Sequence, residues 1–60
     1  MNAYQKLYQL YGTMEAIAKE FGITRQGVTY WKNFGVPANQ AANVEKITKG
    51  KVTILDVIKG

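Results

Sequence analysis

The chain has 60 residues, of which eight are basic and four acidic, giving a net charge of +4. It contains no cysteine and no histidine, which excludes disulfides, zinc sites and histidine-based acid–base chemistry. We therefore expect one small domain that is not an enzyme, with no cofactor, metal or small-molecule substrate, and whose charge either attracts nucleic acid or only keeps the protein soluble.

Glycines divide the chain into segments of helical length. The first segment, before Gly12, repeats apolar side chains such as Leu7 and Leu10 at helical spacing. The second segment runs from about residue 14 to residue 21. Thr13 precedes it as an N-cap, because its hydroxyl can accept a hydrogen bond from an amide of the first turn.

The third segment begins after Thr24, a second N-cap, and ends near Gly35. Its residues Val28 and Trp31 face inward. Pro37 suits the start of a fourth helix. The apolar stripe of that helix consists of Ala41, Val44 and Ile47.

The last segment, KVTILDVIKG, is rich in side chains that favour strands, yet its apolar positions do not alternate. Thr53 and Asp56 are three residues apart and resemble a capping box. We predict a short fifth helix here in preference to a strand, and hence an all-α domain of five helices. The predicted core combines apolar residues of these stripes: Leu7, Leu10, Ile17, Ala18, Phe21, Ile23, Val28, Trp31, Val44 and Ile47.

The second and third segments, about residues 14–33, have the spacing of a helix-turn-helix. Ala18 is small where the two helices cross, and Gly22 occupies the sharp turn, where φ is often positive. Ile23 and Trp31 fill the wedge between the helices. A helical hairpin with a purely structural role can meet the same constraints.

The predicted recognition helix, about residues 24–33, turns Arg25, Gln26, Thr29 and Tyr30 outward. In a helix-turn-helix these positions face base edges in the major groove. Arg can pair with guanine O6 and N7, Gln with adenine N6 and N7, and Thr with a base edge or a thymine methyl. Tyr30 would meet either a phosphate or a thymine methyl; a solvated helix face is the alternative for all four.

Three further residues relate to the same surface. Lys19 and Lys32 flank the motif and can reach phosphates. Gly27 lies inside the recognition helix, where glycine costs up to about 1 kcal/mol relative to alanine. We attribute it to a close approach, either to the preceding helix or to the DNA backbone.

The stretch YGTMEAIAKEFGITRQGVTYWKNFGVP, about half of the chain, resembles the Cro repressors of lambdoid bacteriophages and related short helix-turn-helix regulators. Cro proteins bind double-stranded operators as dimers and repress phage promoters. The resemblance implies that role here, in the cytoplasm of a bacterial host. It assigns base reading to the four outward residues and phosphate contacts to Thr24 and Asn33. We also expect a phosphate contact at Thr13.

This sequence departs from the Cro pattern at the start of the first motif helix. The family often carries polar or basic residues there, whereas this chain has Met14 and Glu15. Glu15 favours the helix N-terminus through the helix dipole but repels DNA. The family also varies behind the motif, and the alternative fold is three N-terminal helices followed by a C-terminal β-hairpin.

One recognition helix reads too few base pairs to define a genomic site, so we expect pairing on a two-fold operator. The tail holds more apolar residues than a short element needs. We predict a weak homodimer, with a tail that only closes its own core as the alternative. The predicted interface residues are Val52, Ile54, Leu55, Val57 and Ile58.

Rival functions remain open at the level of sequence. An antitoxin-like or excisionase-like module shares the same motif, and a protein-interaction domain can use the hairpin structurally. We expect no membrane partner, because no apolar run approaches about 20 residues and the N-terminal stretch has no signal-peptide core. No segment combines a lysine-rich face with a wide aromatic face, as a membrane-surface helix does.

Overall fold

The structure, a computed structural model, describes residues 2–59. Within that range all regular elements are helical, so the all-α prediction is confirmed and the C-terminal hairpin is wrong. The elements are the helices α1 (Ala3–Tyr11), α2 (Met14–Phe21), α3 (Arg25–Phe34), α4 (Ala41–Ile47) and α5 (Ile54–Lys59), with a 3₁₀ turn η1 (Ala38–Gln40) before α4.

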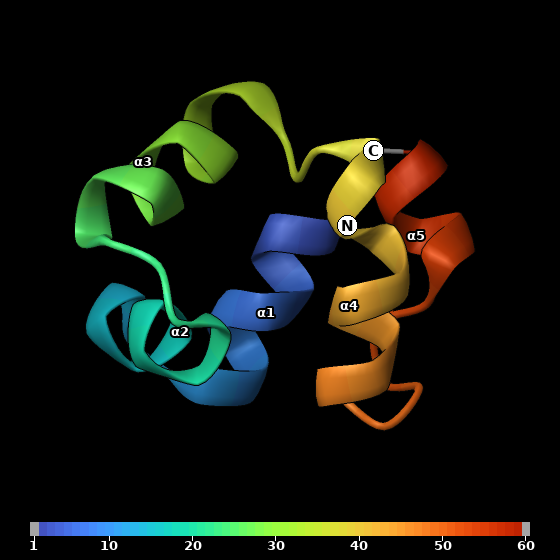
Figure 1. The fold of residues 1–60 in the computed structure, drawn as a ribbon, viewed down its shortest axis with the longest axis horizontal. Helices are drawn as coiled ribbons and strands as arrows, with labels where there is room; N and C mark the ends of the chain where they lie inside the picture. The colour runs from blue at the N-terminus through green and yellow to red at the C-terminus, as the bar shows by residue number, and fades with distance from the viewer. Residues whose placement is uncertain (1, 60) are drawn as a thin grey trace.

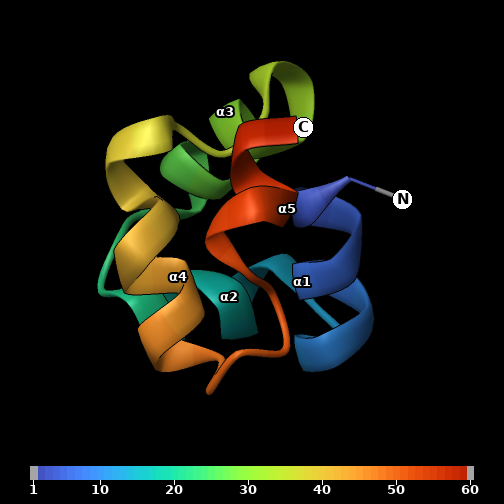
Figure 2. The same ribbon diagram turned by 90° about the vertical axis from the view of Figure 1, so that its right-hand side faces the viewer.

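The helices form two groups around α1. In Figure 1, α2 and α3 lie on the left, α4 and α5 on the right, and α1 between them. Figure 2 shows α5 between α4 and α1. The helix-turn-helix unit is therefore on one side of the molecule and the C-terminal helices are on the other.

The core agrees with the prediction at its centre and differs at its edges. Leu7, Ile17, Val28, Trp31 and Val44 are buried, whereas Phe21, Ile23 and Ile47 are only half-buried. Several residues that were not predicted complete the core: Ala3, Tyr4, Val36, Ala41, Val52 and Val57.

Leu10 was predicted to lie in the core but is exposed. The inward stripe of α1 consists of Ala3, Tyr4 and Leu7, with Tyr11 partly buried at its end. Since successive residues rotate by about 100° around a helix axis, Leu10 falls at the edge of that stripe. Its side chain therefore contributes to the surface rather than to the centre.

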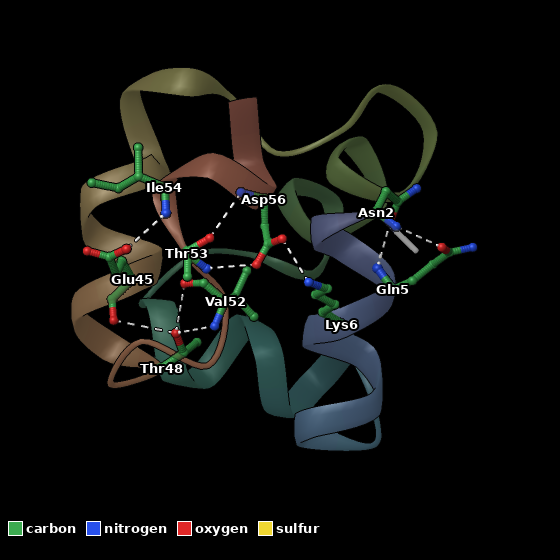
Figure 3. A network of polar contacts seen from close by, with 9 residues as sticks. All are labelled: Asn2, Gln5, Lys6, Glu45, Thr48, Val52, Thr53, Ile54 and Asp56. Carbon is green, nitrogen blue, oxygen red and sulfur yellow. Dashed lines mark hydrogen bonds and ion pairs between the residues drawn. The ribbon is translucent and has the colours of Figure 1, made fainter. Parts of the chain in front are cut away.

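The fourth helix begins later than predicted. Pro37 precedes η1, and the α-helix proper runs from Ala41. After α4, the buried Thr48 organises the turn, because its hydroxyl donates to the carbonyl of Val44 at 2.7 Å. The same hydroxyl oxygen accepts from the amide of Val52 at 3.1 Å (Figure 3). This bond network lets the chain reverse without leaving a buried polar atom unpaired.

The tail forms the predicted short helix, and its capping box is present. The Asp56 amide donates to the Thr53 hydroxyl at 3.2 Å, and the Thr53 amide donates to the Asp56 carboxylate at 3.0 Å. A carboxylate of α4 adds a further cap, because Glu45 accepts from the Ile54 amide at 3.1 Å (Figure 3). Hydrogen bonds at its first turn thus stabilise a helix of only six residues.

An ion pair joins α5 to α1. Lys6 Nζ lies 2.7 Å from Asp56 Oδ1 (Figure 3). The hydrogen bond from Lys6, and then that from the Thr53 amide, lower the pKa of Asp56 from 3.8 to about 2. A lowered pKa means that the charged carboxylate stabilises the fold above its unfolded pKa, and that this contribution disappears as the pH falls through about 2.

We expect Asp56→Asn to lower the melting temperature near pH 7, because asparagine keeps a cap acceptor but loses the charge paired with Lys6. The difference from wild type should shrink as the pH falls from 3.8 to about 2. Melting curves by circular dichroism across that range measure it. The exposed Glu20 provides a matched control, since Glu20→Gln should change the melting temperature little. A difference between Asp56→Asn and wild type that is constant with pH would contradict the assignment.

Candidate nucleic-acid interface

The turn between α2 and α3 has the geometry that the sequence predicted. Gly22 ends α2 with φ of 66°, in the left-handed region. The next amide, of Ile23, donates to the Ala18 carbonyl at 3.0 Å. A glycine adopts this conformation at little cost, and the turn lets α3 pack against α2 (Figure 1).

Threonine caps fix the start of both helices. The Thr13 hydroxyl accepts from the Ala16 amide at 3.1 Å, and the Thr24 hydroxyl accepts from the Gly27 amide at 3.2 Å. Both residues are exposed. Because each hydroxyl accepts a hydrogen bond, its own hydrogen stays free to donate to a phosphate oxygen. The capping roles are confirmed, and the phosphate contacts stay a prediction.

The outer face of α3 is polar and solvent-exposed, while Val28 and Trp31 are buried on its inner face. The Thr29 hydroxyl donates to the Arg25 carbonyl at 3.1 Å, so its methyl group and oxygen lone pairs are what it offers to a partner. The structure places on this exposed face the residues predicted to read bases: Arg25, Gln26, Thr29 and Tyr30.

An aromatic pair extends the outer face at the C-terminal end of α3. The ring of Tyr30 lies 4.7 Å from that of Phe34, between centroids, at an angle of 36°. Phe34 is 74% exposed, which is unusual for so large an apolar side chain. We did not predict Phe34 as part of the surface, although its position four residues after Tyr30 would have placed the two side chains together.

The other side chains predicted to contact phosphates are exposed near the C-terminal ends of α2 and α3. Lys19 lies in the last turn of α2, Lys32 in the last turn of α3, and Asn33 follows it. Lys32 also borders a groove of about 670 Å³. The other residues that line this groove come from α1 and the start of α2: Tyr4, Gln5, Tyr8, Gln9 and Met14.

The space around Gly27 tests one of the two explanations for this glycine, a close approach to the preceding helix. A Cβ atom built on Gly27 would lie 3.4 Å from Ile23 Cδ1, the nearest atom, which is ordinary van der Waals contact with a flexible side chain. Close approach to the preceding helix therefore does not explain the glycine. Approach of the DNA backbone stays a prediction.

The structure shows an ion pair on the recognition surface that the sequence did not predict. Arg25 Nη1 lies 3.3 Å from Glu15 Oε1. The two side chains are 70% and 68% exposed. Their separation of ten positions fits no single-helix spacing, so only the angle between α2 and α3 brings them together.

The apolar tail divides into a buried and an exposed set. Val52 and Val57 are buried, so they close the core of their own chain, and their assignment to the dimer interface is corrected. Leu55 and Ile58 are 58% and 64% exposed, and Ile54 is also exposed. We call Ile54, Leu55 and Ile58 the α5 patch.

Two further findings concern metal-binding groups and membrane-spanning helices in the described part of the chain. No group of three or more acidic side chains is arranged to hold a metal ion within residues 2–59. Of the helices described, none is long and apolar enough to cross a membrane.

Comparison with known proteins gives one informative result. A family model described as Bacterial toxin YdaS matches residues 4–57, nearly the whole chain. This is a family of small bacterial or phage proteins of helix-turn-helix type, in agreement with the arrangement of α2 and α3. The match is not to the Cro family, so the Cro assignment stays a prediction. Searches among curated proteins and among solved structures gave no significant match.

Proposed function

We propose that this chain, which belongs to the bacterial toxin YdaS family, is a non-enzymatic regulator that binds specific sequences of double-stranded DNA. The observation that carries the proposal is the division of α3 into two faces. Val28 and Trp31 anchor the helix in the core, while the polar side chains of the opposite face are left in solvent. A helix that follows a glycine turn and is anchored on one face in this way is suited to enter the major groove.

The side chains of α3 divide into two roles under this proposal. Arg25 and Gln26 lie in the first turn, the part of a recognition helix that faces base edges. The donors of Arg25 suit guanine O6 and N7, and the amide of Gln26 can donate to adenine N7 and accept from adenine N6. Thr29 and Tyr30, one turn later, extend the readout. The residues predicted to contact phosphates are all exposed: Thr13, Lys19, Thr24, Lys32 and Asn33.

The finer proposal is a repressor of Cro type acting on a pseudo-palindromic operator. The resemblance over residues 11–37 and the basic charge support it. An antitoxin-like or excisionase-like role would use the same surface on different DNA. A protein-interaction domain would use the hairpin only as a scaffold and would not need the polar face of α3.

Binding to duplex DNA should weaken steeply with salt. Neutralising phosphates releases counterions, and each phosphate contact contributes about −0.9 to the slope of log K against log salt concentration. Fluorescence anisotropy with a labelled random duplex, between about 0.05 and 0.2 M salt, measures the slope. Lys32→Ala should make it shallower by about one unit. No binding, or binding that salt does not affect, would contradict the proposal.

Pairing through the α5 patch is the proposal for assembly. Helix α5, which carries the patch, lies on the side of the molecule away from α2 and α3 (Figure 1), and the three patch residues are exposed. We therefore expect the patch to stay free while α3 occupies DNA. The Cα trace measures 24 × 22 × 19 Å. Two copies joined at α5 therefore separate their α3 helices by tens of ångströms, as successive major grooves about 34–36 Å apart require.

Leu55→Glu should abolish this self-association without unfolding the domain, because Leu55 is exposed and the new charge is buried only in the dimer. Sedimentation equilibrium and binding to whole and half operators measure the change. Tyr8→Glu, at another exposed apolar residue but on α1, is the matched control and should leave association unchanged. If folded Leu55→Glu protein kept wild-type association and cooperative binding, the dimer surface would lie elsewhere.

The family description supports a second candidate, a toxin role in a bacterial cell. Induced expression in a bacterial host tests it through the growth rate. Arrest by wild type but not by Arg25→Ala would make toxicity a consequence of DNA binding. Arrest by both variants would assign toxicity to another surface, and normal growth with both would contradict the toxin role.

A further inference from the structure

The ion pair between Glu15 and Arg25 joins the first turns of the two helices of the motif. Glu15 is the second residue of α2, and Arg25 is the first residue of α3. Of the two ion pairs among residues 2–59, this one lies on the surface proposed to bind DNA. It places an acidic group beside the arginine best suited to read a base.

The backbone beneath both side chains is held at defined positions. Thr13 and Thr24 cap the two helices, and the Ile23 amide bonds to the Ala18 carbonyl across the turn. The start of α3 therefore has a set position relative to the start of α2. This backbone places the two side chains within reach of each other, and in the rotamers observed Arg25 Nη1 lies 3.3 Å from Glu15 Oε1.

The donor arrangement of arginine permits two partners at once. A guanidinium group carries five N–H donors in a planar fork. The Glu15 carboxylate engages Nη1. The remaining donors, on Nη2 and Nε, form the pair of parallel donors that guanine O6 and N7 accept. A guanidinium already oriented by a carboxylate loses less rotamer freedom when it meets the base.

The negative charge of Glu15 should also increase specificity. A carboxylate near the DNA surface repels phosphates and so weakens binding to every sequence. Orientation of Arg25 by Glu15 strengthens binding only to sequences that have a guanine at the position read by Arg25. Together the two effects widen the gap between specific and non-specific binding.

We propose that Glu15 is a positioning residue that sharpens base reading by Arg25 and suppresses sequence-independent binding. The inference rests on the proposed function and deepens it, since it names an acidic residue of α2 as a determinant of specificity. Its role is exerted through Arg25 and needs no contact of its own with a base.

The experiment compares Glu15→Gln with Glu20→Gln. Both substitutions remove one exposed negative charge from α2, but only Glu15 is paired with Arg25. Affinity is measured for a selected operator, for the operator with the base pair read by Arg25 replaced, and for a random duplex. The position read by Arg25 is the one at which Arg25→Ala loses preference. The same substitutions are also made in the Arg25→Ala background.

Glu15→Gln should lower discrimination at that base pair by about two- to fivefold, the range of an exposed ion pair, and raise affinity for the random duplex. Glu20→Gln should leave discrimination unchanged. In the Arg25→Ala background, Glu15→Gln should have no further effect on discrimination. Melting temperatures should stay near that of wild type, because the paired side chains are exposed.

The outcomes separate the two proposals. Unchanged discrimination in Glu15→Gln, or equal losses in Glu15→Gln and Glu20→Gln, overturns the positioning role while duplex binding by wild type upholds the proposed function. A loss that persists in the Arg25→Ala background also overturns it, since Glu15 would then act directly. Failure of wild type to bind duplex DNA overturns the proposed function and this inference together.

Discussion

Replacing Trp31 with alanine should leave the domain largely unfolded at room temperature. Trp31 is 5% exposed, and its ring meets that of Phe21 edge-on at a centroid distance of 5.5 Å. Removing a buried tryptophan costs about 3–5 kcal/mol, from lost burial and the cavity that remains. A domain of this size has only about 3–9 kcal/mol of stability, so the loss is comparable to the whole.

Thermal and urea unfolding followed by circular dichroism measure the effect. Phe34→Ala is the matched control, because it truncates an aromatic residue on the same helix that is 74% exposed. The control should unfold close to wild type. A Trp31→Ala variant with an unchanged unfolding curve would show that α3 is not anchored through this side chain.

Replacing Arg25 with alanine should cost about 1–3 kcal/mol in binding to a specific operator and relax preference at one base pair. The reason is that a bidentate arginine distinguishes guanine from other bases, whereas a phosphate contact distinguishes none. Arg25 lies in the first turn of α3 with its side chain 70% exposed, so the substitution should leave the melting temperature nearly unchanged.

Binding to an operator and to a series of single-base-pair variants measures the specificity of Arg25→Ala. Lys32→Ala is the comparison, because its loss should weaken all duplexes to a similar degree and reduce the salt slope. If both variants gave the same uniform loss, Arg25 would be a phosphate contact, and base reading would have to be assigned to other residues of α3.

Local signals in the sequence accounted for the positions of most helices. Thr13, Thr24 and Thr53 cap helices because a short hydroxyl side chain reaches its own first-turn amides, which depends only on nearby residues. Gly22 similarly marks the turn of the motif. The tail was ambiguous by propensity, and its capping box correctly favoured a helix.

Contacts between distant segments were not accessible from those signals. The apolar pattern of the tail did not indicate that Val52 and Val57 close the core while Leu55 remains outside, because that depends on how α5 lies against α4 and α1. Leu10 was misplaced for the same kind of reason, since a stripe only two turns long leaves its edge undefined.

At the candidate site, too, a contact between separate helices could not be predicted from the sequence. The position of Arg25 on the outer face followed from the inward direction of Val28 and Trp31. Its pairing with Glu15 did not follow, because it requires the crossing of α2 and α3 in three dimensions. The sequence thus predicted which side chains face outward, but not which of them meet.

Selection from a pool of random duplex DNA tests most directly whether α3 reads sequence in the major groove. We expect enrichment of one motif with two related half-sites, whose centres are about 10 base pairs or one helical turn apart. Arg25→Ala protein should select a motif degenerate at one position of each half-site. If wild type enriched no motif, or if Arg25→Ala selected the same motif with the same preferences, the assignment of base reading to α3 would be contradicted.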